Sequence, residues 1–158
     1  MIRSALATLL ATCMPAGGVA AGTASAAPPP ELVALAAAAR IDEVISHWCR
    51  VQFGAVRERA YAVALRSPGG GGRYAVLGSR GQAFELEPFA GLADLSCYTP
   101  AEARRLDRAL QTSETLRGRI EPVGRSTVVC GFVEQNGAAC WQYSATLHSF
   151  VRVGDWLT

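Results

Sequence analysis

Apolar positions near the start of the chain predict a helix. From Glu31 the sequence is rich in alanine and leucine, and its apolar residues then recur at helical spacing: Leu35, Ala38, Ile41, Ile45 and Trp48. One side of this helix is therefore expected to pack on the core. Near Cys49 the apolar residues begin to alternate with Arg50 and Gln52, which indicates a change from helix to strand.

Three short strands are predicted next, separated by turns. Two β-prone runs, at residues 60–65 and 74–77, flank a proline followed by four glycines at 68–72. A glycine-rich connection between such runs is typical of a hairpin, because glycine accepts positive φ angles. After the turn at residues 79–81, the run at 83–86 predicts a third strand.

A second helix has the clearest start signal in the chain. Thr99 can cap the helix, Pro100 suits its first position, and Glu102 can complete a capping box. Apolar residues at helical spacing then predict an amphipathic helix that ends near Thr112: Ala103, Leu106 and Leu110.

The last third of the chain reads as four strands, at residues 118–122, 127–133, 139–144 and 150–153. Asn136 and Gly137, between the middle two strands, form a typical hairpin turn. The element order is helix, three strands, helix, four strands. We therefore predict a small single α+β domain with a mainly antiparallel sheet, two helices and two disulfides.

The amino-terminal segment is expected to be a secretory signal peptide over residues 1–26. Arg3 supplies a positive start, residues 5–11 an apolar run, and residues 24–26 a small-x-small cleavage site. Residues 27–30 then form a proline-rich leader, and residues 31–158 the α+β domain. This layout predicts an exported protein of the periplasm or the extracellular space.

Cys13 offers an alternative, in which a lipoprotein signal ends in a lipidated cysteine. Thr12 stands where such a signal needs a small residue, so lipidation is disfavoured. The apolar run at 5–11 is far shorter than the ~20 residues of a membrane-spanning helix. No membrane span is therefore expected.

Composition and charge narrow the function classes. The formal net charge is only +2, from 15 Lys+Arg and 13 Asp+Glu residues, and this argues against a nucleic-acid partner. Every one of the basic Lys/Arg positions is arginine. The absence of lysine excludes Schiff-base chemistry, a P-loop lysine and a Ser-Lys dyad.

Four cysteines remain if the signal peptide, with Cys13, is removed. An even number of cysteines in an exported chain predicts two disulfides. Four cysteines allow three connectivities. Pairing nearest neighbours is the simplest, and we favour Cys49–Cys97 with Cys130–Cys140.

The hairpin register conflicts with this pairing. A two-residue turn at residues 136–137 places Cys130 opposite Tyr143 and leaves one fully apolar face. It also places Cys130 and Cys140 on opposite faces, where they cannot bond. A five-residue loop at 133–137 brings the two cysteines opposite one another, but then turns Gln142 inward. The sequence leaves both registers open.

No catalytic residue, metal site or cofactor is assigned from the sequence. Glu43 and His47 are four residues apart on the predicted helix, but an exposed helical pair explains them better than a shared ion. Among catalytic options a thiol enzyme is the least implausible, with Cys49 as the nucleophile and His47 or His148 as its base. The even cysteine count predicts instead that Cys49 is disulfide-bonded.

Trp48 and Trp156 are the candidate interface residues, because large amphipathic side chains often anchor protein contacts. The sequence therefore favours a non-catalytic binding, accessory or inhibitor-like module whose partner is a protein or an envelope component. The alternatives are a thiol-dependent or other hydrolytic enzyme, and a structural subunit that assembles through an exposed edge strand. The oligomeric state stays open.

Overall fold

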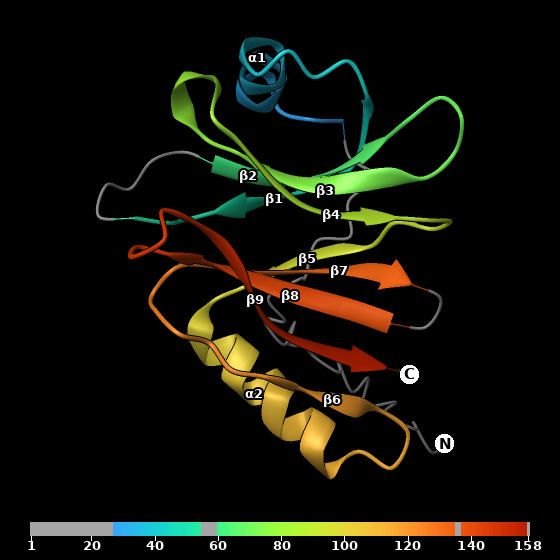
Figure 1. The fold of residues 1–158 in the computed structure, drawn as a ribbon, viewed down its shortest axis with the longest axis vertical. Coiled ribbons are helices and arrows are strands. Elements are labelled where there is room, and N and C mark those ends of the chain that lie inside the picture. The colour runs from blue at the N-terminus through green and yellow to red at the C-terminus, as the bar shows by residue number, and fades with distance from the viewer. Residues whose placement is uncertain (1–26, 55–59, 135–136, 158) are drawn as a thin grey trace, which may run out of the picture.

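Two antiparallel sheets stack face to face, and a helix covers the outer face of each (Figure 1). The computed structural model describes residues 27–54, 60–134 and 137–157. The first sheet, in strand order, contains β1 (Val44–Val51), β2 (Ala60–Arg66), β3 (Gly72–Leu77) and β4 (Ala83–Phe89). The second contains β5 (Leu95–Tyr98), β7 (Val128–Glu134), β8 (Gly137–Ser144), β9 (Ser149–Leu157) and β6 (Arg117–Ile120).

Three apolar layers hold these elements together. Helix α1 (Pro30–Ala38) places Leu32 and Ala36 on the outer face of the first sheet. Helix α2 (Pro100–Thr112) places Ala103 and Leu110 on the outer face of the second sheet. Between the sheets lie buried side chains of both, Tyr74 and Trp141 among them. Because β2 is covered on both faces, all its residues but the last are buried, and this explains its unbroken apolar run.

The fold class is confirmed as a small α+β domain with two helices, antiparallel pairing and two disulfides. The glycine-rich segment connects β2 to β3, as predicted. The capping box is also present: the Thr99 side chain accepts a hydrogen bond from the Glu102 backbone N–H, and the Glu102 carboxylate accepts one from Thr99 N–H. No helix among the described residues is long and apolar enough to cross a membrane.

The first helix is shorter than predicted, and Trp48 lies in β1 rather than near a helix end. The chain leaves the helix through Arg40, whose φ of 55° is left-handed. The Ile41 N–H then bonds to the Ala36 carbonyl and the Arg40 N–H to the Ala37 carbonyl, which is the Schellman arrangement. Glycine usually occupies this left-handed position. The sequence therefore did not indicate that the helix ends before Arg40.

The strands also differ in number and arrangement from the prediction. Among the described residues, β5 was not predicted, β1 begins at Val44 rather than near Cys49, where the change to a strand was expected, and the pairing forms two sheets instead of one. Pro30, assigned to the leader, is the first residue of α1, where its missing N–H costs no helical bond. The predicted signal peptide, residues 1–26, lies outside the described residues.

The register of β7 and β8 follows the cysteines. Cys130 pairs with Cys140 and Val128 with Gln142, so the register expected from a two-residue turn is wrong there. An irregularity between Phe132 and Glu134 separates this pairing from the end of the hairpin. Asn136 of the predicted turn lies outside the described residues.

Gln142 is buried with its polar groups hydrogen-bonded. From the sequence alone, its inward position is an argument against this register. Its side chain is 0% exposed. Its Oε1 accepts a hydrogen bond from the Val123 N–H, and its Nε2 donates one to the Ser126 carbonyl, both at 2.7 Å. The side-chain amide is thus hydrogen-bonded to the backbone of the β6–β7 loop, and these hydrogen bonds offset the cost of burying it.

Gly131 gives Tyr74 its place between the sheets. A Cβ at residue 131 would lie 2.7 Å from the Tyr74 Cζ. The Tyr74 ring is buried and its hydroxyl lies 2.7 Å from the Phe132 carbonyl oxygen, to which it donates. Because the Tyr74 ring is packed in the core and its hydroxyl is hydrogen-bonded, a methyl group at residue 131 must displace either the ring or the β7 backbone.

We expect Gly131→Ala to lower the free energy of unfolding by about 2 kcal/mol, the cost of overpacking. Chemical denaturation measures the change. Gly124→Ala is the matched control, because a Cβ there meets no atom within 4 Å. Equal stabilities of the two variants would contradict the expected clash.

Burial raises the pKa of Tyr74 to about 12. An unfolded tyrosine loses its proton near pH 10, so between about pH 10 and 12 the folded chain holds a proton that the unfolded chain has lost. The contribution of Tyr74 to stability is therefore lost as the pH rises through this window. Absorbance at 295 nm should show a titration step near pH 12, and Tyr74→Phe should remove that step. The absence of a step near pH 12 in the wild-type protein would contradict it.

Candidate binding pocket

A pocket of about 150 Å³ opens among residues of β5, β7, β8 and β9 in the second sheet. Pairing carries one row of residues across the middle strands: Phe132 opposite Ala138, and Ala138 opposite Trp156. All three residues of this row line the pocket. Cys130, the next residue along β7 on the same face, lines it as well.

Small residues flank Trp156 on both neighbouring strands. Trp156 pairs with Ala138 on β8 and with Gly118 on β6. A Cβ at residue 118 would lie 2.5 Å from the Trp156 Cβ, so glycine is required at this position. Trp156 itself is partly buried and packs against the apolar layer under α2. The indole is thus both anchored in the core and available in the pocket.

The opposite wall comes from the start of β5. Asp94, Ser96 and Tyr98 line the pocket, and alternation along an extended chain places them on one face. The backbone of Asp94 is fixed on both sides: its carbonyl accepts from the Phe132 N–H at 3.3 Å, and its N–H donates to the Tyr74 hydroxyl at 3.3 Å. Side chains of this wall are therefore held at a set distance from β7.

Asp94 carries the one unsatisfied buried polar atom found in the side chains that the structure describes. Its Oδ1 is buried and has no hydrogen-bond partner. Buried carboxylate oxygens in proteins are normally hydrogen-bonded, and an unpaired one calls for an explanation. Asp94 thus brings to the pocket a carboxylate whose Oδ1 has no internal donor, and two aromatic residues, Phe132 and Trp156, line the same pocket.

Of the two candidate interface tryptophans, Trp156 alone lines this pocket. Trp48 lies in β1, packs against the layer under α1, and meets the Tyr61 ring edge-on with centroids 5.9 Å apart. The two tryptophans therefore belong to opposite outer layers of the molecule. Sequence reasoning missed Asp94, because an isolated aspartate in a loop carries no recognisable pattern.

The cysteines pair as favoured from the sequence. The bond between Cys49 and Cys97 joins β1 to β5, and so ties an edge of the first sheet to an edge of the second. The bond between Cys130 and Cys140 crosses β7 and β8 directly beside the pocket. In this state Cys49 has no thiolate to offer as a nucleophile.

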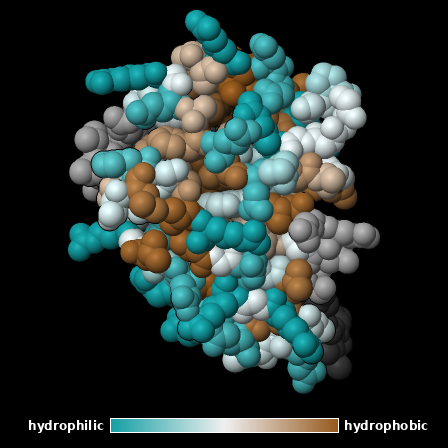
Figure 2. Space-filling model, in the orientation of Figure 1, coloured by the Kyte–Doolittle hydropathy of each residue, from teal (hydrophilic) through white to brown (hydrophobic). Residues whose placement is uncertain are grey.

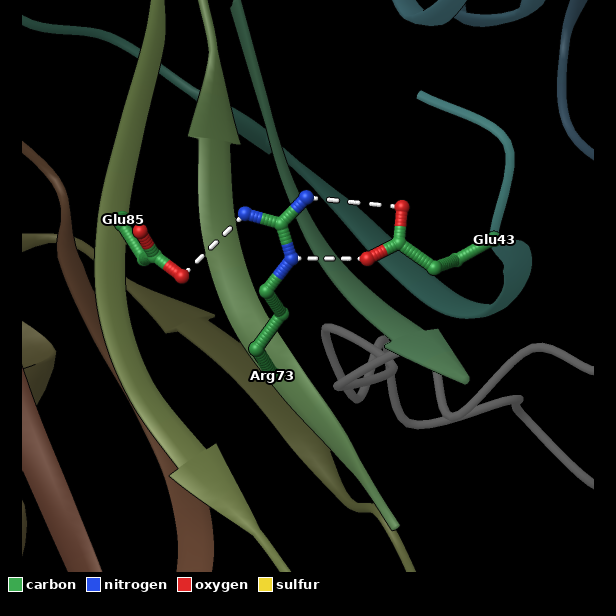
Figure 3. A network of polar contacts seen from close by, with 3 residues as sticks. All are labelled: Glu43, Arg73 and Glu85. Carbon is green, nitrogen blue, oxygen red and sulfur yellow. Dashed lines mark hydrogen bonds and ion pairs between the residues drawn. The ribbon is translucent and has the colours of Figure 1, made fainter. Parts of the chain in front are cut away.

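Glu43 and His47 do not share a helix face, because the chain is already in a strand at His47. Glu43 instead accepts hydrogen bonds from Arg73 at 2.8 and 3.4 Å, and Arg73 reaches Glu85 at 3.2 Å (Figure 3). These hydrogen bonds lower the pKa of the Glu43 carboxyl below its usual value. His47 Nδ1 lies 3.3 Å from the Ser46 hydroxyl. Within the described residues, no three His, Cys, Asp or Glu side chains are grouped as for a metal ion.

The surface separates into zones. On the face drawn in Figure 2, hydrophilic side chains predominate at the lower end, over α2, while hydrophobic ones gather near the level where the sheets stack. An aromatic cluster lies between the sheets, with Phe53 in contact with Phe84, Tyr143 and Phe150.

Compared with known proteins, the chain matches no family model, no curated protein and no solved structure.

Proposed function

We propose that this protein is a non-catalytic binding module that acts in the periplasm or outside the cell, with the Trp156 pocket as its binding site. The observation that carries the proposal is that Trp156 and Asp94, whose Oδ1 has no hydrogen-bond partner, line the same pocket. Binding sites typically pair apolar and aromatic walls with a few placed polar groups.

The frame around the pocket supports a binding role. Cys130–Cys140 links the two strands beside the pocket, and Cys49–Cys97 fixes β5, which carries the opposite wall. Binding to a pre-organised site avoids the entropy cost of ordering it. A rigid pocket of this kind suits recognition of a ligand or of one side chain of a partner.

Two disulfides point to an oxidising compartment. Intact mass spectrometry of the protein purified from its native cells tests the export that we propose. We expect a chain that begins at Ala27, with four cysteines alkylated only after reduction. Free cysteines or an uncleaved Met1 would overturn export, and a lipid-sized mass on Cys13 would replace it by membrane anchoring.

Photocrosslinking tests the binding role. Leu92 is 88% exposed and lies two residues before Asp94, so p-benzoylphenylalanine at this position samples the surface next to Asp94. Val33 on α1, 53% exposed, is the matched control position. In native cells we expect an adduct from residue 92 that is lost on adding Trp156→Ala and is absent from residue 33. Equal adducts at both positions would contradict the proposal, and so would the absence of an adduct at residue 92 together with the absence of small-ligand binding in the pocket.

A further inference from the structure

We propose that the Trp156 pocket binds a primary alkylammonium group, with the ammonium beside Asp94 and the alkyl chain against the aromatic rings. This inference rests on the proposed binding function and names the chemistry of its ligand. The group could belong to a free amine or to a lysine side chain, and the experiment below distinguishes these sources.

Charge selects a cation at this position. Asp94 lines the pocket and forms no ion pair within the described part of the chain, and its buried Oδ1 accepts no hydrogen bond. Hydrogen bonds between a charged donor and a carboxylate are among the strongest in proteins. A bound cation would supply the donors that the protein itself does not bring to Asp94.

The remaining lining suits an ammonium group in particular. Ser96 and Tyr98 carry hydroxyl oxygens on the same wall as Asp94. A primary ammonium group has three N–H donors, so it can donate to the Asp94 carboxylate and to a neighbouring hydroxyl at the same time. Phe132 and Trp156 also line the pocket, and a cation is attracted to the face of an aromatic ring, most strongly to that of tryptophan.

Size limits the ligand to a short chain. The pocket holds about 150 Å³, which corresponds to roughly five waters at ~30 Å³ each. Pockets for drug-sized molecules are larger, at about 300–1,000 Å³. An ammonium with a chain of about four carbons, the length of a lysine side chain, is therefore the expected occupant.

Titration of the ¹⁵N-labelled protein with n-butylammonium tests this assignment. The indole N–H signal of Trp156, identified by its loss in Trp156→Phe, should shift saturably with a millimolar Kd. Butan-1-ol, at matched ionic strength, has the same chain length without the charge and should bind at least tenfold more weakly. Equal shifts from the amine and the alcohol would overturn the proposal.

Substitutions test the role of the carboxylate. Asp94→Asn keeps the shape of the side chain and should weaken n-butylammonium binding at least tenfold, while Asp42→Asn, in the exposed loop before β1, should leave the affinity unchanged. Unchanged affinity in Asp94→Asn would assign the shift to another site. Both variants should retain the dispersed spectrum of a folded protein.

Two further ligands separate the sources of the amine. Tighter binding of 1,4-diaminobutane than of N-acetyl-lysine methylamide indicates a free amine, and the reverse order indicates the lysine of a partner. Photocrosslinking at residue 92 keeps the two proposals distinct. An adduct without any amine binding would overturn the ligand class alone, whereas loss of both would overturn the binding function as well.

Discussion

Replacing both Cys49 and Cys97 by alanine is expected to lower the free energy of unfolding by about 4 kcal/mol. The two cysteines are 48 residues apart, and closing a loop of that length restricts the unfolded chain strongly. The bond also joins edge strands of two different sheets, β1 and β5. Since stabilities of small domains are commonly about 5–15 kcal/mol, this loss is a large fraction of the total.

Urea denaturation at neutral pH measures this loss. The second pair is the natural comparison: Cys130 and Cys140 are only 10 residues apart, and loop closure predicts a contribution of about 3 kcal/mol. The difference in unfolding free energy between each double variant and the wild-type protein should be smaller under reducing conditions than under oxidising ones, because reduction breaks the same bond in the wild type. A loss below about 1 kcal/mol for the Cys49 and Cys97 pair would contradict the proposed role of loop closure.

The second large effect is expected at Gln142. Gln142→Leu keeps the approximate size of the side chain but removes its amide. The Val123 N–H and the Ser126 carbonyl, both in the β6–β7 loop, then lose their hydrogen-bond partner. A buried polar group left without a partner costs about 1–3 kcal/mol, so the loss of stability should be about 3 kcal/mol.

Gln111→Leu provides the control for this change. Gln111 is exposed on α2 and bonds to Asp107 on the helix surface, so its replacement should alter stability by no more than about 0.5 kcal/mol. Thermal denaturation of both variants under the same conditions gives the comparison. A stability of Gln142→Leu equal to that of wild type would mean that water replaces the lost contacts.

Local signals in the sequence predicted local structure. The capping box at Thr99 and the glycines after Pro68 depend only on neighbouring residues, and both features are present. Arg40 shows the converse, because it ends α1 in a conformation that its residue type does not indicate. β5 was missed for a related reason: it has four residues, and its pairing partner β7 lies some 30 residues further along the chain.

Non-local packing decided what the sequence left open. Alternation along a strand shows which residues share a face, but not which sheet the strand joins, so two sheets were indistinguishable from one. The choice between the hairpin registers depended on what an inward Gln142 would meet. That answer came from Val123 and Ser126, in a loop whose position depends on the whole second sheet.

The candidate pocket was predictable only in part. Trp156 could be selected because large aromatic residues often anchor interfaces. Asp94 could not, since its significance comes from a buried oxygen without a partner and from the row of residues that pairing places beside it. Trp48 had the same sequence signal as Trp156, yet it packs under α1. Residue type alone therefore did not distinguish the two tryptophans.

The covalent link between the sheets also determines how the molecule would respond to mechanical load. When the ends of the chain are pulled apart, tension passes from Cys49 to Cys97 through their bond and bypasses the segment between them. Strands β2, β3 and β4 lie in that segment. They can lose their packing under force but cannot be stretched out. The fully extended chain is therefore shorter by roughly 170 Å than it would be without the disulfide, at ~3.5 Å for each of the 48 residues. Under load, most of the first sheet is therefore a shielded loop, and the second sheet, apart from the segment between Cys130 and Cys140, bears the force.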